Sequence, residues 1–211
     1  MLRDLLHKLV SHPAVYDAVQ RAAGAKAIAR WLAAHTGEQR GSRVVLDLGG
    51  GTGLHRALWP AAELYVCLDL DEQKLSGFRA RHPRDAAVQG DAGAIPLASG
   101  CADAVFCSNM SHHLDDRVLS CMMAEAARVL KPDVGRLVFV DAVWAPRRLV
   151  GRLLWRYDRG SHPRTADHLR QTIAQHFRVA RWERMAIFHE YVLCIAAPGD
   201  SRAGAIGPQA A

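Results

Sequence analysis

One short stretch, VVLDLGGGTG at residues 44–53, combines an acid with a run of glycines. Asp47 lies inside the apolar part, and Gly49, Gly51 and Gly53 alternate directly after it. Glycine lets a backbone approach a ligand closely, and a helix that begins after such a loop favours a negative group at its N-terminus. A dinucleotide, a phosphate or a small adenosine cofactor would each suit this loop. A tight turn that binds nothing is the alternative.

Two further acids end the next two apolar runs of the chain. Asp69 follows Gly51 by 18 residues, and Asp91 stands in the GDA triplet at 90–92. An acid in the position of Asp69 can accept both hydroxyls of a ribose, and one in the position of Asp91 can accept from an adenine amino group. A buried Asp47 is costly unless it bonds an N–H or a charged group. A ligand with an ammonium or sulfonium, a ribose and an adenine would use all three carboxylates.

Two competing cofactor classes fit the glycine loop less well. The dinucleotide fingerprint requires a glycine three residues after Gly51, where this chain has Leu54. A phosphate loop requires Gly-Lys-Ser or Gly-Lys-Thr, and no lysine lies near Gly53. The loop therefore favours S-adenosylmethionine over both.

The elements that must position these residues alternate between strand and helix. Apolar, β-branched runs predict strands, and helical spacing of apolar residues predicts helices. The expected strands are 43–49, 64–71, 86–92, 103–109, 135–143, 177–185 and 189–197, and the expected helices are 1–35, a short one within 53–62, and others after Asp71, at 115–130, at 145–157 and after Thr165. This order predicts an α/β fold: a Rossmann-like, seven-stranded, mostly parallel sheet with a C-terminal antiparallel hairpin and helices on both faces.

A chain of 211 residues, half of them hydrophobic, suits one domain of ordinary size. Residues 1–40 are expected to form an N-terminal helical lid. The cofactor-binding domain is expected at 41–197, with a substrate-shaping insert at 144–176, and 198–211 as a flexible tail.

Five motifs in order resemble those of class I S-adenosylmethionine-dependent methyltransferases: VVLDLGGGTG, CLDLD, GDAGAIPL, DAVFCSNMSHHL and EAARVLKPDVGRLVFVD. The similarity covers about 43–141 and looks closest to the small-molecule branch that includes the ubiquinone and menaquinone C-methyltransferases. It implies that the glycines wrap the methionine part of the cofactor, with Asp47 near its ammonium and Asp69 on its ribose. The full cofactor-binding set that it implies is Asp47, Gly49, Gly50, Gly51, Gly53, Asp69, Leu70, Asp91, Ala92, Ser108 and Asn109.

The acceptor side of the site is expected just after the strand at 103–109. Because the cofactor is already activated, the protein mainly aligns the acceptor, and a base is needed only when the acceptor loses a proton. His113 and then His112 are the candidate catalytic bases, with His162 and Tyr157 as further possibilities and helix-entry packing as the alternative.

The tetrapeptides Asn-Pro-Pro-Tyr and Asp-Pro-Pro-Tyr, frequent in enzymes that methylate amines of bases or glutamine amides, are replaced by CSNM at 107–110. A nucleic-acid partner is therefore disfavoured. The expected reaction is methyl transfer to oxygen or carbon of a small, hydrophobic, lipid- or quinone-like acceptor. An RNA methyltransferase and a cofactor-binding protein with a non-methylating role are the alternatives.

The formal net charge of +6 is concentrated in one segment. Residues 147–164 contain six arginines and a single acid, and Arg148, Arg152 and Arg156 recur every fourth residue. This basic amphipathic stripe could lie on an anionic membrane surface or bind an anionic acceptor or RNA. A cover helix with a solvated arginine face is the alternative.

Cysteine usage and the first residues indicate the compartment. The five cysteines are scattered and odd in number, which fits a reducing cytoplasm, and they lack metal-ligand spacing, so no metal site is expected. Charged residues interrupt the N-terminal MLRDLLHKLVSHP, which argues against a secretory signal. We expect a cytoplasmic protein with a peripheral membrane contact as an option. The sequence leaves the oligomeric state open.

Overall fold

The computed structural model describes residues 25–157 and 162–199. Most of the predicted N-terminal lid, part of the basic insert and most of the predicted tail lie outside these ranges. The strands are β1 (Val44–Leu48), β2 (Leu64–Asp69), β3 (Ala86–Gln89), β4 (Ala104–Ser108), β5 (Arg136–Val143), β6 (Phe177–Ala186) and β7 (Glu190–Pro198). The α-helices are α3 (Ala25–His35), α4 (Glu72–Arg81), α5 (Asp116–Val129), α6 (Leu149–Tyr157) and α7 (Ala166–Ala174). Three single 3₁₀ turns are η1 (Gln39–Gly41), η2 (Arg56–Leu58) and η3 (Ser111–His113).

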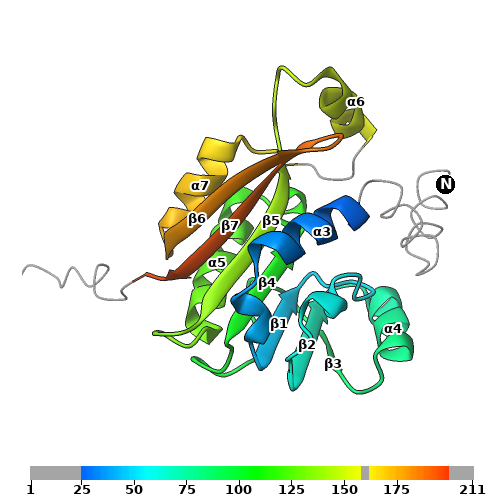
Figure 1. Ribbon diagram of the computed structural model, residues 1–211, viewed down its shortest axis with the longest axis vertical. Helices are drawn as coiled ribbons and strands as arrows, with labels where there is room; N and C mark the ends of the chain where they lie inside the picture. The colour runs from blue at the N-terminus through cyan, green and yellow to red at the C-terminus, as the bar shows by residue number, and fades with distance from the viewer. Residues whose placement is uncertain (1–24, 158–161, 200–211) are drawn as a thin grey trace, which may run out of the picture.

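The described strands form one seven-stranded sheet in the order β3-β2-β1-β4-β5-β7-β6 (Figure 1). The first five strands pair in parallel, and β7 pairs antiparallel with both β5 and β6. The predicted fold class is confirmed, including the antiparallel C-terminal hairpin. Because β7 is inserted between β5 and β6, it alone runs against the other strands.

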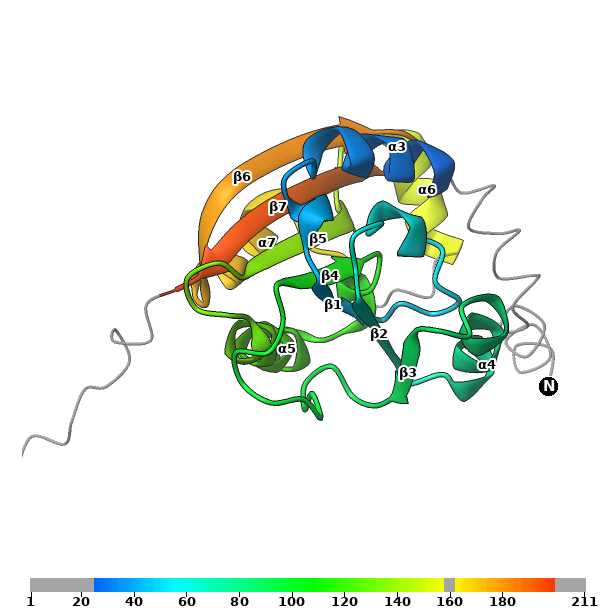
Figure 2. The same cartoon turned by 60° about the horizontal axis from the view of Figure 1, so that its bottom comes forward.

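Helices cover both faces of the sheet, and each face has its own apolar core. On one face, Ile28 and Leu32 of α3 pack with Phe78 of α4 over the β1–β4 region. On the other face, α5 and α7 bury Met122 and Ile173 against the same strands. Figure 2 shows α3 and α5 on opposite sides of the sheet. The two layers hold the parallel strands in register, so their carboxyl ends meet at one edge.

Several local predictions hold at the helix ends. The Asp71 carboxylate accepts from the Gln73 and Lys74 N–H groups at the start of α4, and the Thr165 hydroxyl accepts from the His168 N–H at the start of α7. The short helix expected within 53–62 is instead the single turn η2. The loop runs through Gly53, Pro60 soon follows, and too few residues lie between them to complete an α-helix.

Candidate active site

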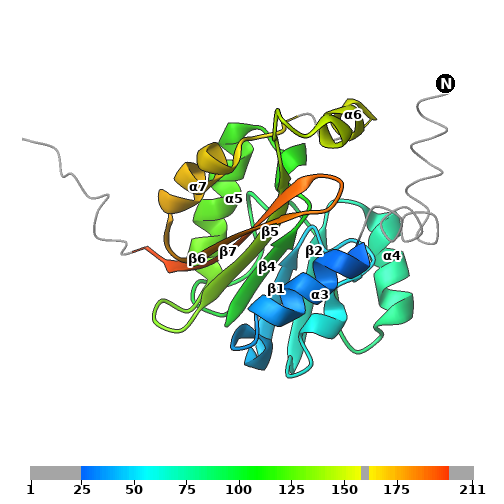
Figure 3. The ribbon, with the colours of Figure 1, turned by 45° about the horizontal axis from the view of Figure 1, so that its top comes forward.

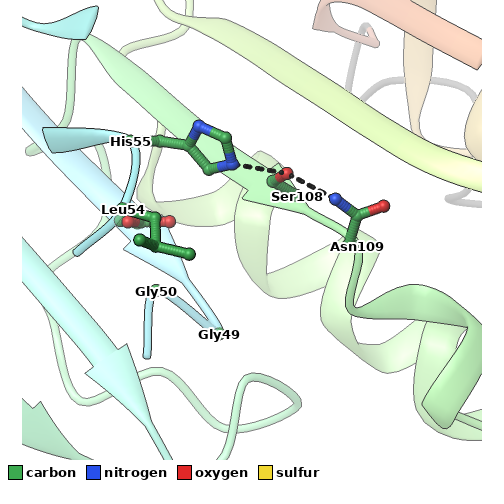
Figure 4. A pocket seen from close by; sticks show the side chains of 7 residues that line it. Gly49, Gly50, Leu54, His55, Ser108 and Asn109 are labelled. Atoms are coloured by element: carbon green, nitrogen blue, oxygen red, sulfur yellow. Dashed lines mark hydrogen bonds between the residues drawn. The ribbon is translucent and has the colours of Figure 1, made fainter. Parts of the chain in front are cut away.

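A pocket lies at the carboxyl ends of β1 and β4, where the chain order of the sheet changes direction. From β1 the chain continues to β2 on one side, while β4 lies on the other side, and open α/β sheets bind ligands at such a point. The pocket is lined by Asp47, Gly49, Gly50, Leu54, His55, Ser108 and Asn109 (Figure 4). Five of these seven were expected from sequence; Leu54 and His55 were not assigned to the site.

The glycine loop has a backbone that other residues adopt only with strain. Gly49, Gly51 and Gly53 have φ angles of +67°, +56° and +76°. A Cβ on Gly49 would lie 2.6 Å from Cγ of Met110, so the loop is pressed against the segment that follows β4. A Cβ on Gly53 would lie 2.6 Å from Cδ2 of Phe78, so that glycine allows α4 to pack closely. The loop therefore serves both the pocket and the packing beneath it.

Asp47 is a buried carboxyl group in the wall of the pocket. Its Oδ2 accepts a hydrogen bond from the Tyr65 hydroxyl at 2.5 Å, and a Cβ on Gly50 would lie 2.5 Å from the same oxygen. Burial raises the pKa of Asp47 to about 7; the Tyr65 hydrogen bond opposes this rise, and the charge of Asp69 adds to it. A cation placed beside Asp47 would favour its ionised form.

Asp69, at the end of β2, fixes the shape of the glycine loop. One of its oxygens accepts from the Gly51 N–H at 2.9 Å, and the other accepts from the Asp71 N–H at 2.9 Å. The side chain thus joins the loop after β1 to the start of α4. It lies beside the pocket-lining glycines and contributes negative charge to the surroundings of Asp47.

The remaining predicted adenosine-binding residues follow β2 and β3 along the same edge of the sheet. Leu70 is 66% exposed, and Ala92 is buried. Asp91 is exposed, and its carboxylate accepts from the Gly93 N–H at 2.8 Å. None of the three belongs to the pocket lining. They lie further along this edge of the sheet than the pocket does, on the side of Asp69.

His55 brings an imidazole into the pocket. Its Nε2 lies 3.3 Å from the Ser108 hydroxyl oxygen, which also accepts from the Asn109 amide at 3.3 Å (Figure 4). Burial against Phe106 lowers the pKa of His55 to about 4, so the ring is neutral at pH 7. Its buried Nδ1 has no hydrogen-bond partner among the described residues. A histidine two positions after Gly53 was the sequence signal for this residue.

The comparisons with known proteins agree with this arrangement. Residues 46–139 match the family described as a methyltransferase domain. The chain is 34% identical over 153 residues to the malonyl-[acyl-carrier protein] O-methyltransferase of Methylococcus capsulatus, covering 68% of this chain and 53% of that one. It is 35% identical over 103 residues to the ubiquinone/menaquinone biosynthesis C-methyltransferase UbiE of Acidiphilium cryptum, covering 45% and 41%. Over residues 46–139 the chain is thus similar to methyltransferase domains, which confirms the predicted resemblance to S-adenosylmethionine-dependent methyltransferases.

The fold of this chain is also similar to that of solved structures. Geranyl diphosphate C-methyltransferase from Streptomyces coelicolor, solved with Mg²⁺, geranyl diphosphate and S-adenosyl-L-homocysteine, superimposes with a TM-score of 0.68 at 14% identity, covering 82% of this chain and 80% of that one. The chain spans about half the length of the curated relatives it matches.

The donor set of the pocket fits the cofactor of this family. S-adenosylmethionine carries an ammonium and a sulfonium, and the buried Asp47 with Asp69 nearby supplies negative charge for such a ligand. The positive-φ turn from Gly49 to Gly51 supplies backbone groups without side chains. His55 is neutral and so brings no opposing charge.

A second cluster of ionisable groups forms around the segment that follows the pocket residues Ser108 and Asn109 in the chain. In η3, His112 is buried, and its Nδ1 lies 2.5 Å from a carboxylate oxygen of Asp141 near the end of β5. The other Asp141 oxygen accepts from the Ser111 backbone N–H at 2.7 Å and from the Ser111 hydroxyl. Burial acts to raise the pKa of Asp141, but the charge of His112 and these hydrogen bonds outweigh it and hold the pKa below its usual value.

The structure gives the two candidate histidines, of which the sequence analysis ranked His113 first, different surroundings. His113 is exposed, with its ring 4.2 Å from that of His112. The His112 ring also meets Trp155 of α6 at 5.5 Å. The backbone N–H of His162 donates to the His112 carbonyl at 3.1 Å, whereas the side chain of Tyr157 lies outside the described residues. His112 thus has a carboxylate partner in Asp141.

Proposed function

We propose that the protein binds S-adenosylmethionine in the glycine-loop pocket and catalyses methyl transfer to oxygen or carbon of a small, hydrophobic acceptor. The observation that supports this most strongly is the buried carboxyl of Asp47 in a pocket wall, beside a positive-φ turn at Gly49 and with Asp69 nearby. The match to a methyltransferase domain over residues 46–139 supports the same reaction class.

Each part of the cofactor has a chemically suited partner in this proposal. Asp47 holds the ammonium, the loop from Gly49 to Gly53 takes the methionine backbone, and Asp69 accepts from the ribose hydroxyls. Leu70 packs on the adenine, whose amino group faces Asp91 beside Ala92. Ser108 and Asn109 line the methionine side. When bound, S-adenosylmethionine supplies a methyl group activated by its sulfonium.

His112 is the proton acceptor in this proposal when the acceptor is a phenol or an enol. The hydrogen bond to Asp141 places the proton of the neutral ring on Nδ1, so Nε2 is the basic nitrogen. Once His112 takes a proton, the Asp141 carboxylate stabilises the imidazolium at 2.5 Å. Asp141 acts through His112 and is therefore a positioning residue. The exposed His113 is the second candidate.

The relatives support both kinds of acceptor atom, since one is named an O-methyltransferase and the other a C-methyltransferase. An oxygen acceptor that is already anionic would attack the methyl group without a base, whereas a phenol or an enol must first lose a proton. The need for His112 therefore distinguishes an anionic acceptor from one that must lose a proton.

Calorimetric titration with S-adenosylhomocysteine tests the binding step. The wild-type protein should bind, and Asp69→Ala should weaken binding by about tenfold or more, because a buried acceptor of charge-assisted hydrogen bonds is lost. Glu63→Ala is the matched control: Glu63 is an exposed acid just before β2 that pairs with Arg43. Failure of the wild-type protein to bind at millimolar ligand would contradict the proposal.

Incubation with methyl-labelled cofactor and a cell extract, followed by solvent partition, tests the transfer step. Label in the organic phase supports a hydrophobic acceptor. Label on RNA or on protein would redirect the search.

A further inference from the structure

One end of the molecule carries a compact group of exposed apolar side chains. Leu149, Val150 and Leu153 of α6 are 74%, 58% and 58% exposed, and Phe188 in the β6–β7 turn is 45% exposed. We call these four residues the α6 face. Single exposed apolar residues are normal on protein surfaces, but a contiguous group indicates an interaction site.

The helix is already anchored to the protein by a different side. Trp155 is 8% exposed and packs edge-on against His112 at 5.5 Å and against His189 at 4.9 Å. Leu149, Val150 and Leu153 follow the spacing of one helix side, so they form a strip that the core does not cover. The packing of the described residues therefore does not bury the α6 face.

The β6–β7 turn continues this strip. A guanidinium nitrogen of Arg148 donates to the Ile187 carbonyl at 3.0 Å, and a Cβ on Gly151 would lie 3.4 Å from the Phe188 carbonyl oxygen. Both contacts hold the turn against α6. Figure 3 shows α6 protruding from one end of the sheet.

Exposed arginines flank the apolar strip. Arg147 precedes the helix, and Arg152 and Arg156 lie one turn apart on it; all three are exposed. Residues 145–157 contain no acid. The face is therefore apolar in the middle and positive at its margins, the charge pattern that complements an anionic lipid surface.

We propose that the α6 face docks on an anionic lipid bilayer, with its four apolar side chains entering the interface and the arginines contacting lipid headgroups. A protruding tip of aliphatic and aromatic side chains suits a fluid interface, because it needs no matching groove in a partner. The described helices include none long and apolar enough to cross a bilayer, and surface docking requires none. Since Trp155 packs on His112 from the inner side of α6, docking places the histidine cluster near the lipid surface with α6 between them. That consequence for acceptor entry rests on the proposed methyl transfer, whereas the docking itself does not.

Co-sedimentation of the full chain with vesicles tests the docking. We expect binding to vesicles of phosphatidylcholine with 30% phosphatidylglycerol, weak binding to phosphatidylcholine alone, and release by high salt. Arg152→Gln with Arg156→Gln should weaken binding about 25-fold, since each arginine near an anionic surface contributes about fivefold. Leu153→Asp should weaken it about tenfold or more.

Val134→Asp is the matched control, because Val134 is 63% exposed but lies in the turn before β5, outside the α6 face. It should bind vesicles within about twofold of the wild type. Thermal unfolding and S-adenosylhomocysteine titration of each variant, which should be unchanged, separate lost docking from lost folding or lost cofactor binding. No binding of the wild type to anionic vesicles, or equal losses in Leu153→Asp and Val134→Asp, would overturn the proposal. In that event an acidic protein becomes the candidate occupant.

Discussion

Replacing Asp47 with asparagine should stabilise the folded protein above pH 7 while it weakens binding of the cofactor. The pKa of Asp47 rises from 3.8 to about 7 on folding, mainly because the carboxyl is buried. Between these values the folded state binds the proton more tightly than the unfolded state. Stability therefore falls as the pH rises from about 4 to about 7 and is level above that.

The size of the effect follows from the shift. Three units correspond to about 4 kcal/mol of unfolding free energy at pH 8. Asparagine has nearly the same shape, its Oδ1 can accept from the Tyr65 hydroxyl, and it carries no charge. Asp47→Asn should thus gain up to about 4 kcal/mol over the wild type at pH 8 and little at pH 4.

Urea denaturation of both proteins at several pH values between 4 and 9 measures this directly. Subtracting one series from the other removes the contributions of the other titrating groups. Tyr65→Phe is the control, because the Tyr65 hydrogen bond lowers the pKa of Asp47; its loss should move the sloping region of the curve to higher pH. A difference between wild type and Asp47→Asn that is constant from pH 5 to 8 would refute the reasoning.

Three further outcomes are expected. Binding of S-adenosylhomocysteine near pH 7 should release a proton, because the ligand ammonium favours ionised Asp47; heats that are the same in buffers of different ionisation enthalpy would contradict this. His112→Asn should lower kcat by about 10² or more for a phenol or enol acceptor and remove the acidic limb of its pH profile, while His113→Asn should change it little; the reverse ranking would assign the base to His113. Gly49→Ala should lower the free energy of unfolding in urea by about 1–3 kcal/mol, because the φ of +67° and the close approach of Met110 leave no room for a Cβ. An unchanged free energy of unfolding would show that the loop can shift to accommodate the Cβ.

The residues that sequence placed well are those at strand ends. Asp47 and Ser108 come from β1 and β4, and the carboxyl ends of neighbouring parallel strands meet at one edge whatever the details of packing. Chain order and hydrophobic pattern were sufficient to bring them into one pocket. The caps at Asp71 and Thr165 depend on four consecutive residues and were equally readable.

The side-chain partners at the site depend on contacts that no local pattern records. His112 and Asp141 pair across 29 residues, through the register of β4 with β5 and the single turn η3. His112 and His113 have the same side chain and adjacent positions, and only the packed turn buries one and exposes the other. His55 enters the pocket because the loop ends in a 3₁₀ turn rather than the expected helix. An acid at the end of β5, matching those that end β1 and β2, was the sequence signal for Asp141.

Two of the buried carboxyls of the site, those of Asp47 and Asp141, have opposite pKa shifts, and the difference indicates where a ligand cation belongs. Asp141 meets a histidine and accepts several hydrogen bonds, which together outweigh its burial and lower its pKa. Asp47 accepts from one hydroxyl and faces the charge of Asp69, and its pKa rises to about 7. Asp141 is thus stabilised from within the chain, whereas Asp47 would gain most from a positive group brought by a ligand. This difference supports our proposal that the cation of the cofactor binds at Asp47 and that the His112–Asp141 pair transfers the proton.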